Sequence, residues 1–206
     1  TTFTNGQTIT KTDCNAGKYY LWTKVTDIAG NRAETIKVSK EFNVTTSISG
    51  GTKKYIKKGG SVTLTPSKGG QAGNITWSTS DSSGAQLSST SGNSVTVKGL
   101  TAGTYTVKAT ESVGGKSTSY TIEVTELKSG GNATVLEGNT VTLKEPIKSS
   151  NAGTITYKVT SGGSYATVNS TTGVVTGKEA LAEKTTATIT ATESNGGATC
   201  TYTVTI

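Results

Sequence analysis

The chain has 206 residues, of which 31% are hydrophobic and 6% aromatic, and its formal net charge is +7. No stretch approaches the roughly 18 consecutive apolar residues of a membrane-spanning helix, so we expect no membrane insertion. The lysines are spread along the chain, and their densest group, at 53–58, contains no arginine. Nucleic-acid faces combine arginines with several aromatic side chains, so we expect no specific nucleic-acid partner.

Residues 1–44 have the pattern of the last strands of an incomplete domain. Strand-like stretches occur near 2–11, 18–26 and 32–44, and three strands alone would leave an apolar face in water. We therefore expect additional N-terminal polypeptide, or strands from a partner, to complete this domain. Asp27 could bind calcium, but a turn-stabilising role is favoured because no carboxylate cluster surrounds it.

Residues 45–126 form the first complete unit, with apolar and polar residues alternating along its strands. At 105–109 and 120–124 every second residue is apolar, which predicts one face in the core and one in solvent, with Lys108 and Glu123 on the solvated face. The turn at 111–115 supplies glycine where a hairpin needs positive φ. The predicted strands are Lys53–Ile56, Ser61–Thr65, Ile75–Thr79, Gln86–Ser88, Ser94–Lys98, Gly103–Glu111 and Ser117–Glu126.

Residues 127–206 repeat this unit, because the segment at 109–124 recurs at 191–206, about 80 residues later. Short strands, Gly-rich turns and the absence of helical periodicity predict an all-β chain of tandem antiparallel sandwiches arranged as a rod. In such a rod Cys14 and Cys200 lie too far apart for a disulfide within one chain, so we expect free or intermolecular thiols. The predicted domains are 1–44, 45–126 and 127–206.

A family resemblance rests on three segments. Residues 166–177 form a strand, a Gly-containing turn and Val-Val-Thr-Gly, and an alternating strand follows at 187–192. This pattern resembles the group 2 bacterial immunoglobulin-like domain. Residues 103–110 of the middle unit are similar, although 92–99 departs from the Val-Thr-Gly form, and 17–31 resembles the tail of another such domain. The resemblance implies immunoglobulin-like sandwiches without shared catalytic residues, used as spacers or weak carbohydrate or cell-surface binders on bacteria and on phage particles.

Residue types that support catalysis are scarce. The chain has no His, which removes the commonest general base and metal ligand. The two cysteines lack zinc-site spacing, and no nucleophile elbow or phosphate-binding loop is present. Glu111 and Glu193 occupy equivalent positions in different units, too far apart for a glycosidase carboxylate pair. We therefore predict no enzymatic activity, no catalytic or metal-binding residues and no cofactor.

Aromatic side chains are the remaining binding candidates. Trp77 and Tyr157 occupy equivalent strand positions in the two units, which favours a core role for both. Trp22 and Tyr55 are the predicted ligand-binding residues.

The functional hypothesis is a non-catalytic spacer or adhesion module of a bacterial cell-surface protein. It would be extracellular, and its partners would be a host-cell surface, a glycan or a protein ligand. The alternative is a decoration module of a phage tail or capsid that binds the host surface or carbohydrate.

Overall fold

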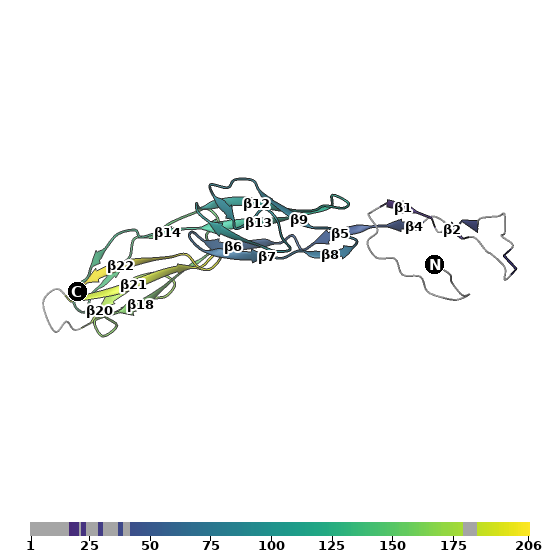
Figure 1. The fold of residues 1–206 in the computed structure, drawn as a ribbon. Helices are drawn as coiled ribbons and strands as arrows, with labels where there is room; N and C mark the ends of the chain where they lie inside the picture. The colour runs from purple at the N-terminus through teal and green to yellow at the C-terminus, as the bar shows by residue number, and fades with distance from the viewer. Residues whose placement is uncertain (1–16, 21, 24–28, 31–36, 39–41, 179–184) are drawn as a thin grey trace.

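The computed structural model describes residues 17–20, 22–23, 29–30, 37–38, 42–178 and 185–206, and in these ranges every regular element is a β-strand. Near the N-terminus, β1 (Gly17–Tyr19) pairs antiparallel with β4 (Phe42–Val44), and β2 (Trp22–Thr23) with β3 (Lys37–Val38). Most of the predicted incomplete domain, including Cys14 and Asp27, lies outside the described residues. The units that follow lie end to end as an elongated rod (Figure 1).

The middle unit is a sandwich of two sheets. One sheet has the order β6-β13-β12-β9 and the other β10-β11-β7, while β5 pairs with β8. Only the β6–β13 pairing of this unit is parallel. This order is that of an immunoglobulin-like sandwich. The strands are β5 (Thr46–Ser49), β6 (Lys53–Lys57), β7 (Ser61–Leu64), β8 (Ser67–Gly70), β9 (Ile75–Thr79), β10 (Ala85–Leu87), β11 (Val95–Gly99), β12 (Gly103–Glu111) and β13 (Ser117–Thr125).

The C-terminal unit repeats this topology. Its sheets have the orders β15-β22-β21-β18 and β16-β20-β19, with β14 paired to β17 and β15 parallel to β22. The strands are β14 (Leu127–Lys128), β15 (Ala133–Thr134), β16 (Thr140–Thr142), β17 (Ile147–Lys148), β18 (Ile155–Ser161), β19 (Ala166–Val168), β20 (Val174–Gly177), β21 (Thr186–Glu193) and β22 (Thr199–Thr205).

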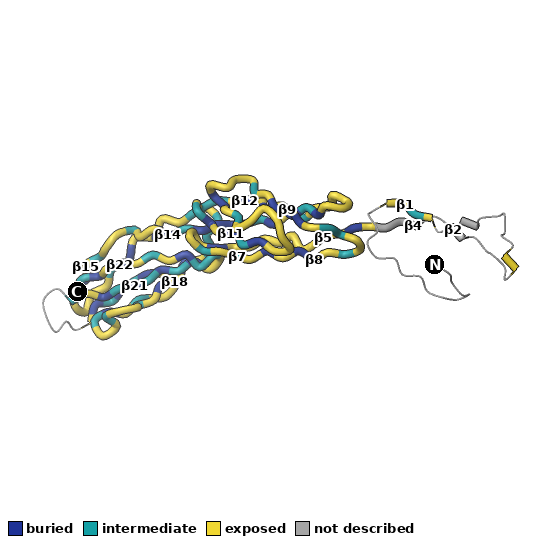
Figure 2. Tube along the Cα trace, in the orientation of Figure 1, coloured by how far each residue is buried: buried dark blue, intermediate teal, exposed yellow. Residues whose placement is uncertain are grey.

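Each unit has its own hydrophobic core, and the two cores share no residue. The strand alternation predicted from the sequence is confirmed, since Val107 and Ile122 are fully buried between the sheets. Trp77 and Tyr157 are also buried, as their equivalent positions indicated. Figure 2 shows buried residues alternating with exposed ones along the strands of both units. We propose that the domain boundaries follow these cores, at 45–126 and 127–206.

The prediction that Glu123 faces solvent is wrong. Glu123 lies on the outer face of its sheet, as the alternation requires, but only 6% of its surface is exposed. Its carboxylate accepts hydrogen bonds from Thr104 (2.6 Å) of the neighbouring strand and from Asn151 (3.1 Å) of the C-terminal unit, and it pairs with the Lys53 ammonium at 3.2 Å. Lys108, the other residue expected on this face, is exposed.

Candidate functional site: the junction between the two units

The junction between the two complete units begins at Thr125, the last residue of β13. Its side chain is fully buried, although threonine is a polar residue at the end of a strand. The hydroxyl donates a hydrogen bond of 2.7 Å to Oε1 of Glu193, which ends β21 in the C-terminal unit. We call this pair, together with its counterpart in the middle unit, the threonine–glutamate clamp.

The Glu193 carboxylate organises the β21–β22 hairpin. Oε1 also accepts hydrogen bonds from the backbone amides of Gly196 (2.8 Å) and Ala198 (3.0 Å), and Oε2 from those of Gly153 and Asn195 (both 2.8 Å). Burial raises the pKa of this carboxyl, but the amides and the Thr125 hydroxyl outweigh burial and lower the pKa to about 2. Glu193 is therefore an ionised, fully engaged structural anchor rather than a free acid or base.

A second contact across the junction comes from Asn151, in the loop that precedes β18. Its Nδ2 group donates to the backbone oxygens of Gly103 (3.1 Å) and Val124 (3.0 Å) and to Oε2 of Glu123 (3.1 Å). Burial raises the pKa of Glu123, but hydrogen bonds from Thr104, Asn151 and Lys53 outweigh it, so the pKa lies below its ordinary value. The amide thus seals a buried, charged group of the middle unit.

Backbone packing completes the junction. Ser149 donates its amide to the carbonyl of Glu126 (3.1 Å), and its Oγ accepts the Glu126 amide (3.0 Å). Gly196 packs so closely on the end of β6 that an added Cβ would lie 2.8 Å from the Ile56 carbonyl oxygen. The tip of the hairpin is therefore pressed against the preceding unit, and a side chain at Gly196 has no room.

The middle unit carries the same clamp. Thr46, the first residue of β5 in this unit, donates to Oε1 of Glu111 at 2.9 Å. The Glu111 carboxylate also accepts the amides of its own hairpin and of the loop before β9: Gly73, Val113, Gly114 and Lys116. Burial raises the pKa of Glu111, and these bonds lower it to about 2. In each complete unit a buried carboxylate therefore binds a threonine at, or just before, the unit's first strand.

The two predicted ligand-binding residues lie in other parts of the chain's sequence. Tyr55 lies on β6 with 39% of its surface exposed, and the Lys53 ammonium sits 5.7 Å from the centre of its ring. Trp22 belongs to β2, but its side chain lies outside the described residues. Binding by either residue stays a prediction.

Sequence reasoning missed the two clamp glutamates as anchors. Along β12 the buried positions run through Tyr105, Val107 and Ala109, and the next inward position is Glu111. The same alternation along β21 leads to Glu193. A glutamate at the inward-facing position that ends the strand, repeated in both units, therefore predicts a buried carboxylate.

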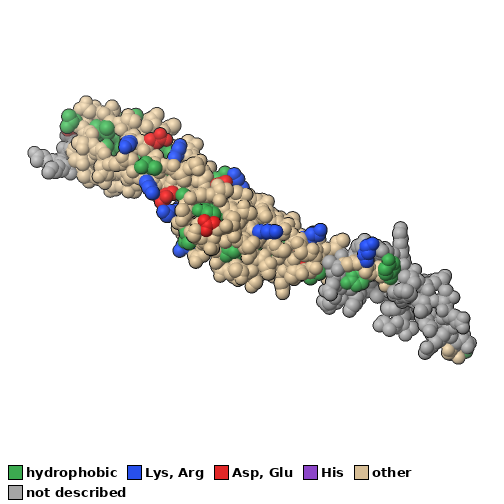
Figure 3. Space-filling view, turned by 90° about the horizontal axis from the view of Figure 1, so that it is seen from above, with side chains coloured by type: hydrophobic (Ala, Val, Ile, Leu, Met, Phe, Trp, Pro, Cys, Tyr) green, Lys and Arg blue, Asp and Glu red, His purple; other side chains and the backbone are tan. Residues whose placement is uncertain are grey.

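Other reactive groups are sparse in the described part of the chain. No three Cys, Asp or Glu residues there are grouped so that they could hold a metal ion. Cys200 is half-buried and unpaired, and burial raises the pKa of its thiol. No helix of the described ranges could span a membrane. Lysine side chains are spread over the face of the described residues shown in Figure 3.

Comparisons with known proteins gave structural neighbours only. No family model and no curated protein matches the chain. A fragment of human CDH23 (EC21-23) is 15% identical, with 91% of this chain and 73% of that chain covered and a TM-score of 0.29. The I-band fragment of titin is 17% identical, with 92% and 74% covered and a TM-score of 0.36. The D00-D0 domain of Intimin is 14% identical, with 79% and 99% covered and a TM-score of 0.36.

Proposed function

We propose that the chain is a non-catalytic spacer and adhesion module of a bacterial cell-surface protein, built from domains of the group 2 bacterial immunoglobulin-like type. The sequence resemblance supports the family. The observation that supports the spacer role is the junction, in which Thr125, Glu193 and Asn151 join consecutive units by one buried and several partly buried hydrogen bonds. The adhesion role rests on the resemblance.

A spacer must hold its ends apart, and that requires stiff connections. Domains joined by polar linkers move relative to one another by default. Here β13 ends at Thr125 and β14 begins at Leu127, so one residue separates the last strand of one unit from the first strand of the next. Nine-residue strands such as β12 and β13 are about 30 Å long. Each stiffly joined unit therefore extends the rod by about that length.

Joint tumbling of the two units tests the spacer role. In the full chain, labelled with ¹⁵N, we expect residual dipolar couplings from both complete units to fit one alignment tensor. A double variant, Thr125→Val with Asn151→Ala, removes the two main side-chain contacts and should give two different tensors. The matched control is Thr106→Val, an exposed threonine on β12. Two tensors in the unmodified chain would refute a stiff junction.

The surface location is tested separately. Antibody raised against the chain should label intact cells of the source bacterium without permeabilisation. If the chain instead co-purifies with phage particles and labels no cell, the virion decoration role replaces the cell-surface role.

A further inference from the structure

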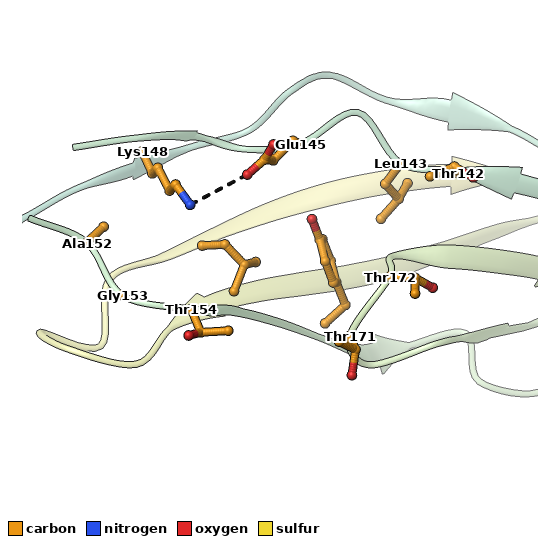
Figure 4. Close-up of a pocket in the computed structure, with 11 residues that line it drawn as sticks. Thr142, Leu143, Glu145, Lys148, Ala152, Gly153, Thr154, Thr171 and Thr172 are labelled. Carbon is orange, nitrogen blue, oxygen red and sulfur yellow. Dashed lines mark ion pairs between the residues drawn. The ribbon is translucent and has the colours of Figure 1, made fainter. Parts of the chain in front are cut away.

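The C-terminal unit contains an open pocket that the spacer role does not use. Its volume is about 680 Å³, within the range of ligand-binding pockets. Its lining residues come from several strands and loops of the unit, as Figure 4 shows, and include Ala152 and Gly153, which follow the junction residue Asn151. Its apolar lining comes from Leu143, Ile155 and Tyr157, and its polar lining includes Thr142, Thr154, Thr171, Thr172, Glu145 and Lys148.

The same region of the middle unit is bridged by its own side chains. Lys68 of β8 donates to the carbonyl oxygen of Gly73 (3.2 Å) and to Oδ1 of Asn93 (3.0 Å). Trp77 fills the core beneath and donates its indole N–H to the carbonyl of Gly92 at 2.8 Å. Lys68 and Trp77 therefore span the space between β8 and the loop before β11.

Three differences leave this space open in the C-terminal unit. Lys148 is the counterpart of Lys68, because each lysine pairs with the strand that leads into its unit. However, Lys148 forms an ion pair of 3.6 Å with Glu145. Two residues separate Leu143 from the buried Pro146, whereas one residue separates the equivalent leucine and proline of the middle unit, so Glu145 has no counterpart there. The loop before β20 spans only residues 169–173, against 88–94 before β11, so it offers no counterpart of Asn93. The smaller Tyr157 replaces Trp77.

The lining of this pocket is neutral and of mixed polarity. The charges of Glu145 and Lys148 cancel, so the pocket has no net preference for an anion or a cation. The four threonine hydroxyls can each donate and accept hydrogen bonds. Leu143, Ile155 and Tyr157 belong to the core and provide a small apolar floor, with 4%, 8% and 7% of their surfaces exposed. A ligand that fits has hydroxyl groups around its edge, an apolar C–H face and no charge.

We propose that this pocket binds a neutral sugar residue of a glycan. A pyranose ring combines peripheral hydroxyls with an apolar C–H face, which matches threonine walls above a Leu, Ile and Tyr floor. The inference rests on the adhesion part of the proposed function, to which it adds a ligand class. It assigns recognition to the C-terminal unit, away from the predicted Trp22 and Tyr55.

Saturation-transfer NMR on the full chain tests the pocket, with methyl glycosides of glucose, galactose, rhamnose and N-acetylglucosamine as probes and a glycan array for longer sugars. We expect at least one neutral glycan to bind. Thr171→Arg should weaken binding at least tenfold by placing a long side chain in the mouth. Ser91→Arg, on the corresponding loop of the middle unit, is the matched control and should leave binding unchanged. Tyr157→Trp, which copies the middle unit, should also abolish binding.

The outcomes separate this inference from the proposed function. Absence of neutral glycan binding, or binding that survives both Thr171→Arg and Tyr157→Trp, would overturn the pocket assignment. Binding of N-acetyl-leucine amide alone would also overturn it, in favour of a peptide ligand. The alignment of the two units is measured in the same samples. A chain that stays stiff without binding sugar fails this inference alone, whereas a chain that lacks a stiff junction fails the spacer role.

Discussion

Replacing Glu193 by glutamine tests the clamp most directly, because the side chain keeps its size and loses only its charge and one acceptor. The two carboxylate oxygens together accept five hydrogen bonds, three on Oε1 and two on Oε2. If the glutamine oxygen takes the Oε1 position, its NH₂ group faces the amides of Gly153 and Asn195. Both are donors, so two backbone amides lose their acceptor.

The expected cost follows from that count. A buried donor left without an acceptor costs about 1–3 kcal/mol, so the two orphaned amides cost about 2–6 kcal/mol in the free energy of unfolding. For a domain of this size, 1 kcal/mol shifts the melting temperature by about 4–8 °C. We therefore expect Glu193→Gln to lower the melting temperature of the C-terminal unit by at least about 8 °C.

Differential scanning calorimetry of the full chain, with urea titration at neutral pH, measures this change. Glu137→Gln is the matched control, because Glu137 is exposed and the variant loses the same charge. Glu111→Gln should produce a similar loss in the middle unit, since Glu111 accepts an equivalent set of bonds. If Glu193→Gln and Glu137→Gln differ by less than about 0.5 kcal/mol, the carboxylate does not anchor the hairpin.

Three further outcomes are expected. Thr125→Val removes one hydrogen bond to a charged group and should cost about 1.5–3 kcal/mol in urea unfolding, while an unchanged midpoint would refute the contact. Gly196→Ala forces a methyl group against the Ile56 carbonyl and should cost about 1–3 kcal/mol, whereas Gly163→Ala, whose added methyl group would make only an ordinary 3.9 Å contact with Val159, should be nearly neutral in the same titration. The pKa values of Glu111 and Glu193 are depressed to about 2, so their contribution to stability is complete above about pH 4.5 and declines as the pH falls towards 2. Urea midpoints measured from pH 7 to 2 should follow that course, and a flat profile would contradict it.

The strands and both cores could be predicted from the sequence, because alternation is a local property of the chain. The strands predicted at 53–56, 75–79 and 103–111 agree with β6, β9 and β12 to within one residue. The environment of Glu123 could not be predicted in the same way. Its partners are Thr104 and Lys53 on neighbouring strands and Asn151 in a loop of the next unit, and no periodicity within β13 indicates that these groups meet there.

The clamp and the pocket differ in how far the sequence reveals them. The burial of Glu111 and Glu193 can be predicted from the sequence, because each occupies the next inward-facing position of an alternating strand. The pocket depends on a comparison of loop lengths and on the direction taken by Lys148, which turns towards Glu145 instead of crossing the gap. Those features depend on three-dimensional packing. In the sequence, the presence of Tyr157 where the middle unit has Trp77 indicates only a smaller core residue.

Each clamp joins the hairpin of a unit to the start of that unit. Glu111 holds Thr46, the first residue of β5, and Glu193 holds Thr125, two residues before β14. A gene encoding such domains can therefore be lengthened or shortened by whole repeats through recombination, because every inserted copy brings its own clamp glutamate. The length of the rod can then change in steps of one unit, without a change of fold.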